Sequence, residues 1–237
     1  MRKSFVALLL AAVFWHPRQV PPAAADQAPP SPASVTHGGH PAHGMQHRFE
    51  HAEDWVRVFD DPARDAWQRP AEVVRLLALS PGMTVVDLGA GTGYFVHHLS
   101  PAVGAQGRVL ALDVEPDMIR YLKERVAGER LGNVEARVVQ PDDPGLPDGS
   151  VDRILVVDTW HHIGDRARYG KKLAAALKPD GFVMIVDFTK ESKSGPPPEM
   201  RLGPEQVAAD LAGGGLGAAA VEESLPEQYV VIGRKPP

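Results

Sequence analysis

The sequence of 237 residues contains no cysteine. This absence excludes disulfide bonds, thiolate ligands for metals, cysteine nucleophiles and lipid attachment through cysteine. It does not identify a compartment, because exported proteins can also lack cysteine. The sequence has no excess of basic residues either, since 25 Lys and Arg stand against 30 Asp and Glu. Nucleic-acid-binding domains carry basic patches, so the composition predicts no nucleic-acid partner.

The apolar run near the start of the sequence is too short to span a membrane. It covers residues 5–15, follows Arg2 and Lys3, and precedes several prolines and the small residues 23–25. A membrane helix needs about 20 apolar residues, whereas this order of features is typical of a secretory signal peptide. We therefore predict a signal peptide at residues 1–25 and a periplasmic or secreted protein, with a cytoplasmic location as the alternative.

Residues 26–50 have the composition of a disordered linker. They are rich in Pro, Ala, Gly, Ser and His, which cannot bury enough surface to order a chain. Glycine and proline interrupt any helix that would align the histidines of this region, so we predict adventitious metal binding and no metal site. A metal-handling envelope protein that uses this segment is an alternative function. The clustered histidines are His37, His40, His43, His47 and His51.

Residues 51–237 are long enough for one α/β domain. Residues 51–78 have helical patterns and are predicted to form a lid across a ligand site. Apolar strands then alternate with helices, which predicts a doubly wound, Rossmann-like sheet of seven strands, mostly parallel with the last strand antiparallel. The expected strands are residues 85–88, 108–113, 134–139, 153–157, 182–186, 218–222 and 228–232.

A glycine-rich turn follows the first strand in the segment VVDLGAGTGYF, residues 85–95. Its glycines are Gly89, Gly91 and Gly93. Glycine allows a tight turn and lets a ligand approach the backbone. A dinucleotide fingerprint would place its third glycine at position 94, where Tyr94 stands. The turn therefore predicts a nucleoside-binding loop of another kind.

Polar side chains also follow the next three strands. Asp113 lies about 20 residues beyond the glycine turn, the spacing at which an acidic residue binds ribose hydroxyls. In doubly wound sheets, ligands bind beyond the carboxyl ends of the strands, so we expect these side chains at one site. The others are Asp142, Asp143, Asp158, His161 and His162.

Four segments, taken in order, resemble the successive motifs of class I S-adenosylmethionine (SAM)-dependent methyltransferases. They are VVDLGAGTGYF, VLALDVEPDMI, NVEARVVQPDDPGLPDGSVDRILVVDTWHHIGD and ALKPDGFVMIVDF. The likeness covers about residues 70–190 and is greatest to the small-molecule group that includes ubiquinone/menaquinone-biosynthesis enzymes. The segment FDDPARDAWQRP is similar to a bacterial group whose members often begin with a signal-like peptide. The resemblance implies SAM as cofactor.

The resemblance also implies the residues around the methionine part of SAM. The backbone at Gly89, Gly91 and Gly93 is expected to approach this part of the cofactor. Asp87 is expected to orient the loop or to reach the amino group through water. Asp158 is expected beside the methyl group.

For the nucleoside part, the resemblance implies that Asp113 binds the ribose hydroxyls and that Val114 flanks the adenine. Asp142 is expected to accept from the adenine amino group, and the Asp143 backbone N–H to donate to the ring. The family usually has glycine before this aspartate, whereas this sequence has Pro141. Proline cannot donate a hydrogen bond and stiffens the turn, which weakens the Asp142 assignment.

His161 and His162 are the candidate catalytic residues. Methyl transfer requires donor and acceptor to be held at near-attack distance, and an acceptor with a proton also needs a base. These two histidines are next to the expected methyl position, and imidazole titrates near neutral pH. In the alternative interpretation, they only bond the backbone and cap the following helix.

Several acceptors are excluded by motifs that the sequence lacks. The loop after the fourth strand has neither the N/D-P-P-Y/F motif of amino-methylating nucleic-acid enzymes nor a pair of glutamates for protein arginine methylation. Cysteine-dependent arsenite methylation is excluded by the missing thiol. A small organic acceptor remains, aromatic or quinone-like given Trp160 and the lid residues Trp55 and Trp67. A SAM- or nucleoside-binding protein without turnover is the alternative.

Overall fold

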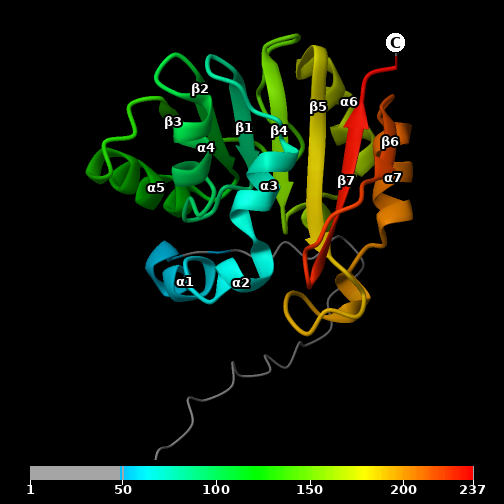
Figure 1. Cartoon of the computed structure of the whole chain (residues 1–237), viewed down its shortest axis with the longest axis horizontal. Helices are drawn as coiled ribbons and strands as arrows, with labels where there is room; N and C mark the ends of the chain where they lie inside the picture. Colours follow the sequence, from blue (N-terminus) through cyan, green and yellow to red (C-terminus); the bar gives the residue numbers. More distant parts are fainter. Residues whose placement is uncertain (1–48, 50, 237) are drawn as a thin grey trace, which may run out of the picture. The chain divides into compact units, whose positions relative to one another are not determined.

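A seven-stranded sheet forms the centre of the domain (Figure 1). The computed structural model describes residue 49 and residues 51–236; the predicted signal peptide and nearly all of the predicted linker lie outside them. None of the described helices is long and apolar enough to cross a membrane. The strands are β1 (Thr84–Leu88), β2 (Arg108–Asp113), β3 (Val134–Val138), β4 (Val151–Val157), β5 (Leu177–Phe188), β6 (Gly217–Ala220) and β7 (Gln228–Arg234).

The strand order is β3-β2-β1-β4-β5-β7-β6, which confirms the predicted fold class. β1 to β5 pair in parallel, and only the last strand, β7, runs antiparallel to both of its neighbours. The order reverses between β1 and β4, so the ligand site of such a sheet is expected at their carboxyl ends. β5 is longer than the predicted strand 182–186, and its extension carries Asp187.

Helices cover both faces of the sheet, and each face has its own hydrophobic core. α3, α4 and α5 supply Val73, Leu99 and Leu122 to one core, whereas α6 and α7 supply Leu173 and Leu211 to the other. The helices are α1 (Ala52–Phe59), α2 (Arg64–Gln68), α3 (Pro70–Leu76), α4 (Val96–Val103), α5 (Pro116–Gly128), α6 (Arg166–Ala176) and α7 (Pro204–Gly213), with 3-10 turns η1 (Trp160–His162) and η2 (Pro198–Met200).

α1 and α2 lie at the carboxyl ends of the parallel strands, the lower side in Figure 1. Polar contacts attach α1 to α5: the Ala52 backbone N–H donates to Asp117 at 2.7 Å, and Asp60 pairs with Arg125 at 2.9 Å. Arg125 also donates to the Thr92 carbonyl in the glycine turn, at 3.1 Å. The first helices are therefore tied to the same turn that the sequence singles out.

Candidate functional site

A cavity of about 740 Å³ opens where β1, β2 and β4 end. Its volume lies within the roughly 300–1,000 Å³ of small-molecule sites. The glycine turn and the ends of β2, β3 and β4 form its walls, and residues from the first helices, among them Phe59 and Arg64, also line it. The cavity is thus where strand order predicts a ligand, with the predicted lid contributing to it.

Gly91 connects the glycine turn to the end of β2. It lines the cavity with φ of 52°, and its N–H donates to Asp113 Oδ2 at 2.8 Å. A Cβ atom here would lie 3.4 Å from the Phe59 ring, an ordinary van der Waals contact. The positive φ of the turn is therefore the reason for glycine at this position.

The two other glycines serve packing. Gly89 also lines the cavity, but a Cβ atom on it would overlap the Thr159 side chain after β4. A Cβ atom on Gly93 would overlap Leu122 of α5, and Gly93 does not line the cavity. Both have positive φ, 78° and 93°. The third glycine thus allows close packing of α5, and its approach to the ligand stays a prediction.

Asp113 ends β2 and lines the cavity together with Val114. Its carboxylate accepts from the backbone N–H groups of Gly91 and Glu115, at 2.8 and 3.0 Å. Burial raises the pKa of Asp113, whereas these backbone donors oppose the increase. Each carboxylate oxygen has a further lone pair, so the group can still accept from a diol.

Asp87, which is buried, and Asp158, which is partly buried, are two further acidic groups that line the cavity. Burial raises the pKa of each to about 7, and the positive charge of Arg64 opposes both increases. Asp87 Oδ2 has no hydrogen-bond partner among the described residues. A buried acceptor without a partner is costly, so its place in a cavity wall indicates a ligand that donates to it.

Arg64 connects the lid to Asp158 through two routes. Its Nη2 lies 3.7 Å from Asp158 Oδ2, and its Nε and Nη2 donate to Gln68 Oε1 at 3.2 and 2.9 Å. Gln68 in turn donates to Gln228, and Gln228 donates to Asp158. Both glutamine side chains are buried. α2, β7 and the end of β4 therefore share one polar network.

The two candidate catalytic histidines lie in η1 but have different surroundings. His162 lines the cavity, with its ring centroid 5.9 Å from that of Phe49. The His161 side chain is 2% exposed, does not line the cavity, and places Nδ1 3.0 Å from Asp187 Oδ2. Only His162 is therefore in position to meet a ligand, and Asp187 is a partner that sequence reasoning missed.

Asp142 and Asp143 do not line the cavity, in disagreement with their predicted adenine contacts. Residues 140 and 143 form an isolated bridge in which the Asp143 N–H donates to the Gln140 carbonyl at 3.1 Å. The Asp143 carboxylate pairs with Lys172 at 2.8 Å. Gln140 and Pro141, which precede them, line the cavity.

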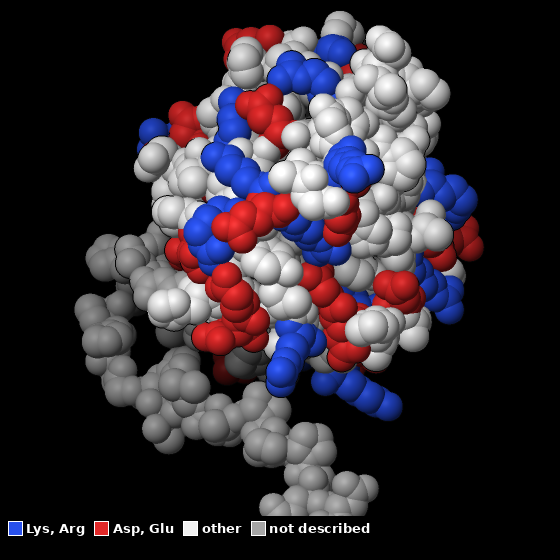
Figure 2. Space-filling model, turned by 90° about the vertical axis from the view of Figure 1, so that its left-hand side faces the viewer, with Lys and Arg blue, Asp and Glu red and all other residues white. Residues whose placement is uncertain are grey.

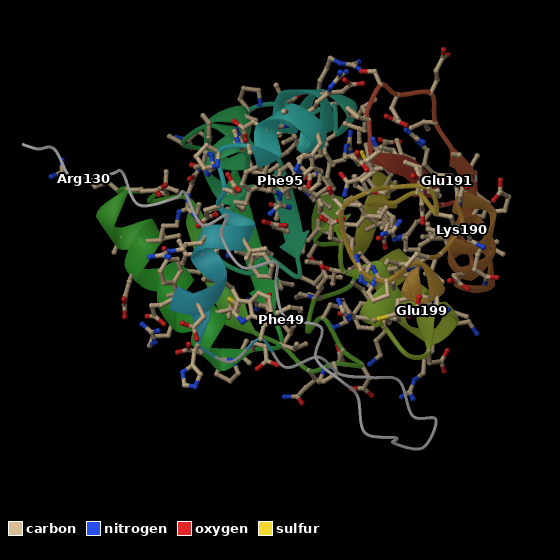
Figure 3. The ribbon with its side chains drawn as sticks, turned by 90° about the horizontal axis from the view of Figure 1, so that it is seen from below. Phe49, Phe95, Arg130, Lys190, Glu191 and Glu199 are labelled. Atoms are coloured by element: carbon tan, nitrogen blue, oxygen red, sulfur yellow. The ribbon has the colours of Figure 1, made fainter. Side chains whose placement is uncertain are left out.

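An aromatic cluster covers the lid side of the cavity. Phe49 lies 4.9 Å from Trp55 and 5.7 Å from Phe59, and Trp55 stacks on Phe59 at 5.5 Å (centroid distances). Figure 3, seen from the carboxyl ends of the strands, places Phe49 near the middle of this face. Trp160, in contrast, is fully buried in the core, so its predicted part in the acceptor site is wrong. Trp67 packs on Phe188.

On the face that Figure 2 shows, Lys and Arg side chains are interspersed with Asp and Glu side chains. Ion pairs explain this mixture on α5, where Arg120 contacts Asp117 and Glu53 at 2.8 and 2.6 Å. Within the described ranges, no three His, Asp or Glu side chains are grouped so that they could hold a metal ion.

Comparisons with known proteins agree with this geometry. Residues 85–181 match the family model described as "Methyltransferase domain". The crystal structure of a SAM-dependent methyltransferase from Aquifex aeolicus is 32% identical, with a TM-score of 0.72 over 76% of this chain and 96% of that one. A ubiquinone/menaquinone biosynthesis C-methyltransferase from Hydrogenovibrio crunogenus is 28% identical over 52% of this chain and 48% of its own.

Nocamycin O-methyltransferase from Saccharothrix syringae is a further relative. It is 28% identical over 66% of this chain and 54% of its own length. The chain thus spans about half the length of these curated relatives.

Proposed function

This chain belongs to the class I SAM-dependent methyltransferases, and we propose that it transfers a methyl group from SAM to a small aromatic or quinone-like acceptor. One observation carries the proposal: a single cavity is lined by the glycine turn and Asp113 and also by His162 and the rings of Phe49 and Phe59. The turn and Asp113 provide the groups that a nucleoside with an amino-acid tail requires. The two rings and His162 provide flat apolar surface and a base in the same cavity.

The residues present fit SAM. Asp113 would accept from the ribose hydroxyls, and Val114, 45% exposed, offers an apolar surface to the adenine. Asp87 Oδ2, buried without a partner, would accept from the ammonium group. When bound, SAM supplies an electrophilic methyl group on a positively charged sulfur. The negative charge of Asp158 would stabilise this sulfonium centre.

The aromatic rings that line the cavity favour a planar apolar acceptor. The rings of Phe49 and Phe59 supply flat surface, and stacked or edge-to-face contacts between rings stabilise a complex by about 0.5–1.5 kcal/mol beyond burial. The names of the relatives, a C-methyltransferase of quinone biosynthesis and an O-methyltransferase, support a small-molecule acceptor for this chain.

His162 would act as the base. It lines the cavity, so its imidazole can take the proton from a phenol hydroxyl or an acidic carbon as the new bond to the methyl group forms. His161 would contribute indirectly. Its contact with the buried Asp187 fixes η1 and thereby the direction of the neighbouring His162.

A product assay tests the function and the acceptor class together. The full chain is incubated with SAM and either phenols, catechols and hydroquinones or aliphatic amines and carboxylic acids, and S-adenosylhomocysteine and methylated product are measured by mass spectrometry. We expect turnover with the aromatic set. Turnover with the aliphatic set alone would contradict the acceptor class, and failure of SAM to bind would contradict the function.

We also propose export of the protein, from the charged start, short apolar run and small residues at its N-terminus. Cleavage after Ala25 would leave Asp26 as the first residue of the mature protein. Mass spectrometry of the protein purified from its native cells checks this. An intact Met1 in the cytosolic fraction would contradict export.

A further inference from the structure

Arg64 is the only Lys or Arg among the described residues that line the cavity. It comes from α2, in the lid, and its side chain is 12% exposed. The guanidinium lies over the Tyr94 ring, with Cζ 4.0 Å from the ring centroid. Tyr94 is itself fixed, because its hydroxyl donates to Asp65 at 2.5 Å. The arginine is therefore held in a defined orientation at the ligand site.

The hydrogen bonds of Arg64 leave part of its guanidinium available. Nε and one N–H of Nη2 donate to Gln68, and one N–H of Nη1 donates to the Phe59 carbonyl at 2.8 Å. A guanidinium has five N–H donors, so one remains on each terminal nitrogen. Asp158 is near Nη2 at 3.7 Å, longer than a hydrogen bond. Two donors on adjacent nitrogens match the two oxygens of a carboxylate.

The charges in the cavity suggest which ligand group these donors meet. Asp87, Asp113 and Asp158 line the same cavity and provide acceptors for positive or hydroxyl groups. The methionine part of SAM carries a carboxylate as well as an ammonium group, and a buried carboxylate requires a cation. Resting on the proposed function, we propose that Arg64 binds the α-carboxylate of SAM and makes α2 part of the cofactor site.

A simpler role is possible for this arginine, and it has the opposite electrostatic consequence. If Arg64 only compensated the charges of Asp87 and Asp158, its removal would leave these groups free to attract any cationic ligand. Decarboxylated SAM, which lacks the carboxylate alone, keeps the ammonium and sulfonium groups. The two roles therefore differ in how this compound and SAM respond to loss of Arg64.

Calorimetric titration of the full chain with SAM and with decarboxylated SAM separates them. We expect Arg64→Met to weaken SAM binding about 10- to 100-fold, the size of a lost charge-assisted hydrogen bond. Decarboxylated SAM should bind this variant as well as the wild type or more tightly, because repulsion between cations is removed. Arg57→Met, an exposed residue of α1, removes the same charge outside the cavity and should change neither affinity.

The other outcomes separate the two proposals. Wild-type protein that binds neither compound would overturn the proposed function. Equal weakening of both compounds by Arg64→Met, or of neither, would overturn the carboxylate assignment alone. If Arg64→Met fails to fold, Arg64→Lys is used in the same comparison, since it keeps the charge but loses the paired donors. If Arg64→Lys binds SAM more weakly than the wild type but binds decarboxylated SAM equally well, the assignment is supported. If the affinities for both compounds change equally, or neither changes, it is contradicted.

Discussion

Replacing Gly89 by alanine tests whether this glycine serves packing against the loop after β4. The residue has φ of 78°, and a Cβ atom would overlap the Thr159 side chain. The left-handed backbone costs an L-residue about 1–2 kcal/mol, and overpacking adds about 1–3 kcal/mol. We therefore expect Gly89→Ala to lower the free energy of unfolding by about 2–5 kcal/mol.

Gly82→Ala is the matched control. Its φ is 91°, but no atom lies within 4 Å of the position of a Cβ atom. Only the backbone cost of about 1–2 kcal/mol should appear. Urea denaturation followed by circular dichroism measures both variants, and a change in the midpoint at constant slope reports stability.

A second substitution identifies the clash. Thr159→Ala by itself removes a hydrogen bond to the Val157 carbonyl, 2.8 Å long, and should cost about 1 kcal/mol. In the Gly89→Ala background it should restore part of the lost stability, because Oγ1 and Cγ2 are removed. Equal destabilisation by Gly89→Ala and Gly82→Ala, or additive effects in the double variant, would refute the packing role of Gly89.

Three further predictions concern the site. Asp113→Ala should weaken SAM binding about 10- to 100-fold in calorimetry, because the ribose hydroxyls lose their acceptor. It should also lower the free energy of unfolding by about 1–3 kcal/mol in urea denaturation, because two backbone N–H groups lose theirs. An unchanged affinity for SAM would contradict the ribose assignment. His162→Ala should lower kcat about 10²- to 10⁴-fold and leave the Kd for SAM unchanged. His161→Ala should lower kcat and also destabilise the fold. Full activity of His162→Ala would contradict the role of His162 as the base. Because the raised pKa values of Asp87 and Asp158 keep protons bound in the folded state, unliganded stability should fall as pH rises from about 4 through about 7, while SAM binding strengthens. Thermal melts and titrations at several pH values check this, and a flat profile of both quantities would contradict it.

The parts of the site that follow strand ends were accessible from the sequence. Asp113 and Asp158 were identified because parallel strands end at one edge of the sheet, and Asp87 from the family resemblance; all three line the cavity. The same rule also gives Asp187, which directly follows the expected strand 182–186, but the strand ends considered for the site were those of the first four strands. β5 extends to Phe188 and includes Asp187.

Other parts depend on tertiary contacts that have no local pattern. Arg64 meets Asp158, and Gln68 meets Gln228, across long stretches of sequence and between separate elements. His161 and His162 are adjacent and could not be distinguished from the sequence. In the structure both belong to the 3-10 turn η1, but only His162 lines the cavity. Asp142 followed the family pattern, but Pro141 before it, and not Asp142, is among the residues that line the cavity.

The structure of the full chain with S-adenosylhomocysteine is the most direct test of the cofactor site. We expect the ribose hydroxyls within hydrogen-bond distance of Asp113 and the amino group at Asp87, with the sulfur facing His162, which lines the same cavity. A nucleoside bound outside this cavity, or bound inside it with the ribose away from Asp113, would contradict the site described above.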